Sequence, residues 1–235
     1  ELVEELVERV RMRLGATDGV DGGPERRAPF PTADILALMG AGETAVLVDG
    51  PRIVVINNDR PGTFARLAGV LALHGIDVLG ARAHSDEQGM AASLFRTADA
   101  ARQVDWTAVE SDIRRALAGE LALSARLAER ARTYRRRRRP AAASVLSPSV
   151  DFIDGASSNA TVIEVRAPDS IGLLHRVATA LAEMGLDIRH ATVQTIGPSV
   201  VDSFYVRTSE GAKVTDPYHR AEIERALLHA VGSPS

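Results

Sequence analysis

The spacing of apolar residues along the chain predicts two amphipathic helices, each of which follows a turn that contains glycine and polar residues. In the first helix, apolar side chains fall at positions i, i+3, i+4 and i+7, so they share one face. These residues are Phe64, Leu67, Ala68 and Leu71. Gly75 then ends the pattern, because glycine readily adopts the left-handed conformation that follows many helices. The stripe predicts a helix packed against a sheet.

The same pattern returns after a constant offset of 110 positions. The stripe recurs at Leu174, Val177, Ala178 and Leu181. Identical residues coincide across the offset at Asp59/Asp169, Gly62/Gly172, Arg66/Arg176, Ala68/Ala178, Leu71/Leu181, Ala72/Ala182, Gly75/Gly185 and Asp77/Asp187. Two copies are too few for a solenoid, and they predict a duplicated domain.

Runs of β-branched residues around each helix predict strands. In the first copy, the runs at 44–48 and 53–56 flank an Asp49-Gly50 turn and predict a hairpin. A helix, two strands and a second helix follow, so each copy has the order ββαββα. The remaining strands and second helices are predicted at 78–84, 90–97 and 104–118 in the first copy, and at 150–153, 161–165, 188–196, 200–208 and 223–231 in the second.

These elements divide the chain into two repeated domains and two connecting parts. Glycine and proline interrupt regular structure between 15 and 31, after a helical pattern at 1–14 and before a short helix near 33–39. We expect the chain to be part of a longer protein. The predicted parts are an N-terminal helix and linker at 1–42 (the tail of a preceding domain), the first domain at 43–118, a helical, arginine-rich linker at 119–143, and the second domain at 144–235.

Composition excludes several classes of function. Hydrophobic residues make up 45% and charged residues 25% of the chain, which is ordinary for a globular protein. A net charge of −3 argues against a general nucleic-acid binder, and the absence of cysteine excludes disulfides and thiol catalysis. No apolar run approaches the roughly 18 residues that cross a bilayer, and the charged residues at 1–14 do not form a signal peptide. We therefore expect no membrane contact and a cytoplasmic location.

The turn ahead of each helix is the candidate for chemistry. A helix N-terminus offers unpaired backbone N–H groups and the positive end of a dipole, which suits a carboxylate or a phosphate. Gly62 and Gly172 allow a ligand to approach the backbone closely. Asn57, Asn58 and Asp59 add amide and carboxylate groups. The alternative is that the two glycines serve only the turn geometry.

The motifs around these turns resemble those of ACT domains. The first copy has Asn-Asp-Arg-Pro-Gly at 58–62 and Gly-Ile-Asp-Val at 75–78; the second has Ala-Pro-Asp-Ser-Ile-Gly-Leu-Leu at 167–174 and Gly-Leu-Asp-Ile at 185–188. The resemblance implies two α+β, ferredoxin-like units, each a four-stranded antiparallel sheet with two helices, that pair sheet to sheet and bind amino acids at the interface. Because the order here is ββαββα, we expect the strands at 44–48 and 150–153 to take the place of the usual final strand at the sheet edge.

The second copy also resembles the C-terminal region of a narrower family, the bifunctional PII uridylyltransferase/uridylyl-removing enzymes. The matching stretches are 160–169, 185–188, 193–195 and 202–206. The resemblance implies glutamine sensing in nitrogen control, with the glutamine signal passed to catalytic domains that lie outside this chain and act on PII protein. The parent enzyme would use Mg and a nucleoside triphosphate. In this chain we expect no catalytic residue, no metal site and no cofactor.

In amino-acid-sensing ACT domains, the contacts come from the strand–helix turn and from an Asn after the helix, where this chain has Asp77 and Asp187. The second turn has Ala167 and Pro168 in place of Asn57 and Asn58, so we expect unequal sites and favour the first turn for the amino-acid head group. The expected ligand-binding residues are Asn57, Asn58, Asp59, Arg60, Pro61, Gly62, Thr63 and Asp77 in the first copy, and Asp169, Ser170, Ile171, Gly172, Leu173 and Asp187 in the second.

Several alternatives remain open at this point. The chain fits a free-standing tandem ACT sensor for another amino acid, with the two units paired within one chain or in a homodimer. An enzyme is a weaker alternative, since the six histidines show no metal spacing and His175, beside the second turn, fits a structural role. The run Arg135 to Arg139 suggests an acidic or nucleic-acid partner, but we favour a solvated linker between the domains, held extended by self-repulsion.

Overall fold

A computed structural model describes residues 30–98, 104–137, 147–196 and 199–232, together with Glu4, Val7 and Glu8. The helix predicted at 1–14 otherwise lies outside the described residues, as do Arg138 and Arg139 of the arginine run.

The described part of the chain forms one antiparallel sheet of eight strands, four from each copy of the repeat. The strands are β1 (Ala45–Asp49), β2 (Arg52–Asn58), β3 (Val78–Ser85) and β4 (Met90–Thr97) in the first unit, and β5 (Ser149–Phe152), β6 (Thr161–Pro168), β7 (Leu186–Ile196) and β8 (Ser199–Thr208) in the second. Their order across the sheet is β1-β2-β4-β3-β7-β8-β6-β5. The predicted fold class of two four-stranded units is confirmed.

The extra strand at the start of each unit lies where the permuted order places it. β1 pairs only with β2 and β5 only with β6, so each occupies the outer edge of its own unit. The permuted arrangement ββαββα is therefore confirmed in both copies.

The two units join through β3 and β7, within one chain. Ala81 pairs with Ala191, and the flanking pairs are Gly80 with Thr192 and Arg82 with His190. Because Ala81 and Ala191 are separated by the repeat offset of 110, the junction lies on an approximate two-fold axis that relates the two units. The ACT–ACT pairing thus uses both copies of one chain.

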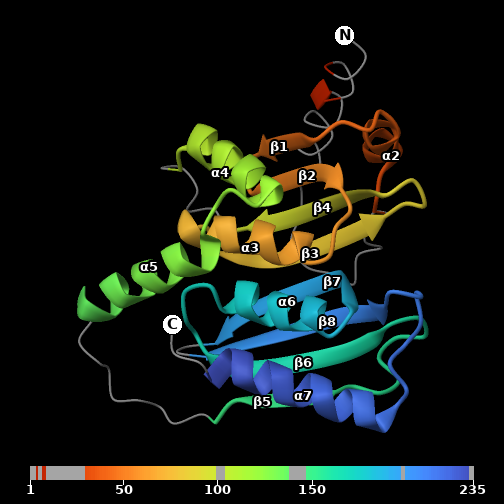
Figure 1. Ribbon diagram of the computed structural model, residues 1–235, viewed down its shortest axis with the longest axis vertical. Helices are drawn as coiled ribbons and strands as arrows, with labels where there is room; N and C mark the ends of the chain where they lie inside the picture. The colour runs from red at the N-terminus through yellow and green to blue at the C-terminus, as the bar shows by residue number, and fades with distance from the viewer. Residues whose placement is uncertain are drawn as a thin grey trace.

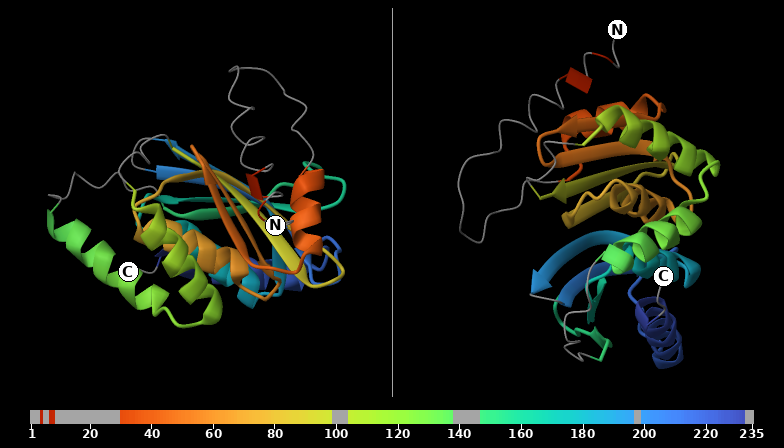
Figure 2. Two further views of the ribbon diagram at one scale, coloured as in Figure 1. Left: turned by 90° about the horizontal axis from the view of Figure 1, so that it is seen from above. Right: turned by 90° about the vertical axis from the view of Figure 1, so that its left-hand side faces the viewer.

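Five helices cover one face of the sheet, and one covers the opposite face of the first unit (Figures 1 and 2). The first five are α3 (Thr63–Leu73), α4 (Trp106–Ala118), α5 (Leu123–Arg137), α6 (Leu173–Glu183) and α7 (Pro217–Gly232), and the last is α2 (Ala33–Gly40). Strand alternation explains the two layers: in β2, Ile53 and Val55 face α3, whereas Val54 and Ile56 face α2. The core under α3 and α6 is continuous across the junction and includes the fully buried Phe95 and Phe204.

The segment between the units is helical, but its first half is not the extended, solvated connection that we weighed from the arginine run. Leu123, Leu127 and Ala131 are 7%, 4% and 7% exposed, and Leu123 and Leu127 join the same core. They recur every four residues, so one stripe of α5 is buried while Arg126 and Arg130 remain exposed. Charge repulsion therefore did not decide the conformation of this segment.

Candidate functional site

The first turn (residues 57–63) joins β2 to α3. Gly62 is the N-cap of α3 at φ 77°, a left-handed conformation that glycine adopts without strain. The Thr63 N–H donates to the Arg60 carbonyl at 3.0 Å. No described side chain caps this helix, however, so the N–H groups of Phe64 and Ala65 have neither an intrahelical acceptor nor a side-chain acceptor. The turn therefore presents donors suited to an anionic group.

Two buried polar atoms flank this turn. Asn57 and Thr63 are 3% and 5% exposed, and Asn57 Oδ1 and Thr63 Oγ1 have no hydrogen-bond partner among the described residues. The Asn57 amide nitrogen donates to the Asn58 carbonyl at 2.6 Å. Buried polar groups are normally paired, so unmatched oxygen atoms at a helix start indicate a place for a hydrogen-bonding ligand.

An arginine that coincides in both copies braces each turn. Arg66 Nη1 donates to the Pro61 carbonyl at 3.2 Å. Arg176 Nη1 donates to the Ile171 carbonyl at 3.0 Å, and its Nη2 donates to Ser170 Oγ at 2.8 Å. The sequence showed that Arg66 and Arg176 occupy the same position of the repeat, but it did not show that they hydrogen-bond to the turns.

The first turn faces the second unit. Asp59 lies close enough to Asp187 to affect its titration: the pKa of the Asp187 carboxyl is raised, first by burial and then by the Asp59 charge, while Arg189 opposes the shift. Asp187 was predicted as a residue of the second copy's site, yet it interacts electrostatically with Asp59 in the turn of the first copy. The candidate site is thus composite, with the turn from one unit and the start of β7 from the other.

Arg189 is the residue of this site that the sequence did not identify. It occupies a β-bulge between Ile188 and His190, and such bulges re-aim a side chain. Its guanidinium is partly buried, and burial followed by the nearby Arg207 lowers the pKa of Arg189. It interacts electrostatically with Asp59 and Asp187, but no hydrogen bond reaches it from the part of the chain that the structure describes.

The corresponding bulge in the first unit carries a different side chain. It lies between Val78 and Gly80, so Leu79 occupies the position equivalent to Arg189. The repeat offset pairs these two positions and could have revealed the difference. One unit therefore contributes a cation at its bulge and the other an alkyl group, which supports the expectation that the two sites are unequal.

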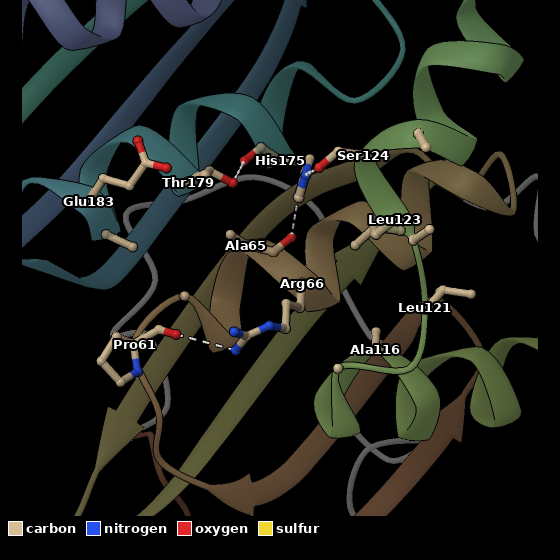
Figure 3. A pocket seen from close by; sticks show the side chains of 15 residues that line it. Pro61, Ala65, Arg66, Ala116, Leu121, Leu123, Ser124, His175, Thr179 and Glu183 are labelled. Carbon is tan, nitrogen blue, oxygen red and sulfur yellow. Dashed lines mark hydrogen bonds between the residues drawn. The ribbon is translucent and has the colours of Figure 1, made fainter.

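A cavity of about 600 Å³ extends from the first turn along α3 and α6 to the start of α5 (Figure 3). Of the predicted site residues, Pro61 and Gly62 line it. Gly172 instead lines a smaller cavity of about 320 Å³ beside α5. The polar side chains around the larger cavity are Arg66, Ser124, His175, Thr179 and Glu183.

His175 lies at the junction of α3, α5 and α6. Its Nδ1–H donates to the Ala65 carbonyl at 2.7 Å, and Nε2, 3.4 Å from Ser124 Oγ, accepts from that hydroxyl (Figure 3). Burial lowers the pKa of His175, which favours the neutral ring that this pairing requires. The hydrogen bonds support the structural role expected for this histidine.

The remaining predicted residues are mostly on the surface. Asn58, Asp59, Arg60, Pro61 and Asp77 of the first copy are exposed, as are Asp169, Ser170 and Asp187 of the second, whereas Ile171 is half-buried and Gly172 and Leu173 are buried. Their role in binding stays a prediction. What distinguishes the first turn is the pair of unmatched buried oxygen atoms and the Arg189 guanidinium.

A buried acid lies near the second turn. Asp202 is 2% exposed on the helix-facing side of β8, and its Oδ1 has no hydrogen-bond partner within the described ranges. Burial, together with the nearby Asp169, raises the pKa of Asp202 to about 7, although a hydrogen bond from the Gln194 backbone N–H opposes the shift. Val165 pairs with Asp202 as Val55 pairs with Ser93, so the first unit has a neutral hydroxyl at this position.

Neither a metal site nor a membrane span is found in the part of the chain that the structure describes. No group of three or more His, Asp or Glu side chains there is arranged to hold a metal ion. None of the described helices is long and apolar enough to cross a bilayer.

Comparison with known proteins agrees with the two-unit fold. The family model for the ACT domain matches residues 52–116 and 161–217, which together make up just over half of the chain. The chain belongs to the ACT-domain family.

The curated relatives are bifunctional uridylyltransferase/uridylyl-removing enzymes. The enzyme of Azospirillum brasilense is 34% identical over 187 residues, which are 78% of this chain and 20% of that enzyme. Those of Caulobacter vibrioides and Streptomyces coelicolor are 36% and 38% identical, over 76% and 69% of this chain and 19% and 20% of the respective enzyme. The chain thus spans about a fifth of the length of these relatives, and its resemblance to their regulatory region is confirmed.

Proposed function

We propose that the chain is the amino-acid-sensing regulatory region of an enzyme that modifies PII protein in cytoplasmic nitrogen control, and that its ligand is glutamine. The observation that carries the proposal is the composite site. Asp59 of the first turn interacts electrostatically with Asp187 and Arg189 of the second unit. Asn57 and Thr63 of the same turn each hold a buried oxygen atom without a hydrogen-bond partner among the described residues.

The chemistry of these groups suits a free amino acid. A ligand carboxylate would be bound by the Arg189 guanidinium and by the uncapped N–H groups of α3, because both favour a negative charge. The α-ammonium group would bind Asp59 and Asp187. The side-chain amide of glutamine supplies N–H donors, which the unpaired Oδ1 of Asn57 can accept.

A composite site also offers a mechanism of regulation. A ligand that touches the turn of one unit and the bulge of the other binds best to one arrangement of the two units, so it favours that arrangement. Such a bias transmits a coupling free energy of typically about 1–3 kcal/mol to a second site. In this proposal the second site lies in the catalytic domains of the parent enzyme, which would hold the Mg and nucleoside triphosphate and contact PII.

The test is calorimetric titration of the chain with each of the twenty amino acids. We expect glutamine to bind, and Arg189→Leu, which copies Leu79, to weaken binding by roughly tenfold or more, since one charge-assisted hydrogen bond contributes about 1.5–3 kcal/mol. Arg166→Leu is the matched control, because Arg166 is exposed on β6 and pairs with Glu164. A response to serine or to a branched-chain residue, without a response to glutamine, would instead indicate a tandem ACT sensor for that amino acid.

A further inference from the structure

The helix between the units lies over one of the two ends of the α3–α6 pair. At one end, the first turn meets the end of α6, and at the other, the second turn (residues 167–173) meets the end of α3. Figure 1 shows α5 at the second of these ends, where α6 begins. The two ends are related by the repeat, but within the described part of the chain a helix covers only one of them.

The space around glycines at equivalent positions shows how closely α5 covers each end. We compare the atoms that a Cβ atom would meet at each glycine. At the open end, a Cβ atom on Gly62 or Gly185 would meet no atom of the described residues within 4 Å. At the covered end, a Cβ on Gly172 would lie 3.4 Å from Leu127 Cδ1, and a Cβ on Gly75 would lie 2.7 Å from Arg130 Nη2. The space that is free beside the first turn is therefore filled by α5 beside the second.

A single face of α5 makes both contacts. Leu127 and Arg130 are three positions apart, so their side chains project from the same side of the helix. The helix is fixed there by the buried Leu123 and by Arg126, whose Nη1 lies 3.5 Å from Asp112 Oδ2 on α4. The small cavity lined by Gly172, Arg176 and Leu127 is what remains of the space beside the second turn.

We propose that α5 is an internal occupant of the second interfacial site, so that the chain binds one zwitterionic amino acid at the first turn and a second one only when α5 leaves. This inference rests on the proposed amino-acid binding at the first turn. Leu127 and Arg130 occupy the position that a ligand would take between the second turn and the end of α3. Displacement of α5 then links ligand binding to the chain segment that connects the two units.

The first test is the number of glutamine molecules bound per chain, measured by calorimetry. We expect one for the natural sequence and one for Arg132→Ala, an exposed residue of the same helix. The double variant Leu127→Ala with Arg130→Ala should bind two, the second more weakly because Leu79 and Ala167 stand where the first site has Arg189 and Asn57. Circular dichroism establishes that the double variant is folded. A folded double variant that binds one glutamine, or a natural chain that binds two, overturns the proposal.

Amide hydrogen exchange gives a second test that does not require the double variant to be stable. With glutamine bound to the natural chain, we expect new protection at 57–63 and at 187–189 and none at 169–173. Protection at both turns overturns the role of α5. If no amino acid binds the natural chain, the proposed function fails. In that case, amide exchange without ligand tests whether α5 covers the second turn. Arg130→Ala should accelerate the exchange of the Gly75 and Gly172 amides at least threefold relative to Arg132→Ala. Equal exchange rates in the two variants would overturn the proposed coverage by α5.

Discussion

His175 donates a hydrogen bond to the carbonyl of Ala65, the residue that occupies its own position in the other copy of the repeat. The two positions lie 110 residues apart and meet where α3 and α6 pack together. Only one of two equivalent residues that face each other there can be large. The duplicated chain has therefore diverged at its contact between helices, as it has at the bulges that carry Leu79 and Arg189.

Gly69 is predicted to allow the close packing of α3 against Leu123 of α5 and His175 of α6. A Cβ at Gly69 would lie 2.5 Å from Leu123 Cδ2 and 2.8 Å from His175 Nδ1. We expect Gly69→Ala to lower the free energy of unfolding by about 1–3 kcal/mol through overpacking, although alanine ordinarily favours a helix. Urea denaturation measures the change. Gly40→Ala, at the end of α2, is the control: a Cβ there would meet none of the described residues within 4 Å, so the change should be neutral or stabilising.

Asp202 is predicted to make stability depend on pH. Its folded-state pKa of about 7 lies above the unfolded value, so the folded state binds the proton more tightly. The resulting contribution to stability is complete below about pH 4, the unfolded pKa, and is lost as pH rises through about 7. At pH 8 we expect the free energy of unfolding of Asp202→Asn to exceed that of the natural chain by about 2–4 kcal/mol, because one pKa unit corresponds to about 1.4 kcal/mol. Urea denaturation measures the difference.

The same comparison at pH 5 provides the control for Asp202. The advantage of the Asn variant should shrink there, because the natural carboxyl is protonated in the folded state. Asp202→Ser, which copies Ser93 of the first unit, should show the same loss of pH dependence. An advantage that is equal at pH 5 and pH 8 would contradict the assignment of the titration to Asp202.

The Asn57 side chain is predicted to lower the stability of the fold slightly and to contribute to ligand affinity. Its Oδ1 is buried without a partner among the described residues, so this oxygen loses its hydration on folding and gains no hydrogen bond in return. Removal of the amide removes that cost in free energy. We expect Asn57→Ala, which copies Ala167, to leave the free energy of unfolding unchanged or to raise it by up to about 1 kcal/mol. Affinity for glutamine should fall roughly tenfold, the equivalent of about 1.4 kcal/mol. Undiminished affinity in calorimetry would remove Asn57 from the site.

The continuous core predicts that the two units unfold together. Phe204 is fully buried in the second unit, and Phe204→Ala should cost about 3–5 kcal/mol. Trp106, the only tryptophan of the chain, lies in α4 of the first unit and reports on that unit by fluorescence. We expect the variant to shift the fluorescence midpoint and the circular dichroism midpoint equally. A fluorescence midpoint that does not move would show that the first unit unfolds independently.

The repeat made most of the fold predictable, because apolar spacing and turns recur at one offset. Even Asp202 could have been placed inward, since it alternates with Val200, Phe204 and Val206 along one strand. The composite nature of the site was not predictable in this way. The electrostatic interaction between Asp59 and Asp187 depends on the pairing of β3 with β7, and no local pattern specifies which edges of the two units meet.

The helix α5 illustrates a different reason for a missed feature. The spacing of Leu123, Leu127 and Ala131 is a regular helical stripe, but the arginines beside it dominated our interpretation of the segment. In the structure these three apolar side chains are buried although the neighbouring arginines carry like charges. Periodicity was the better guide here than net charge.

The junction of β3 with β7 has a consequence for how a ligand site between the two units would respond in a cell. Where an ACT pair forms between separate chains, the fraction of complete ligand sites depends on protein concentration. Here both halves of the pair are tethered, so their local concentration is fixed by the chain itself. A response built on this site would follow the amount of ligand and be independent of how many copies of the protein are present.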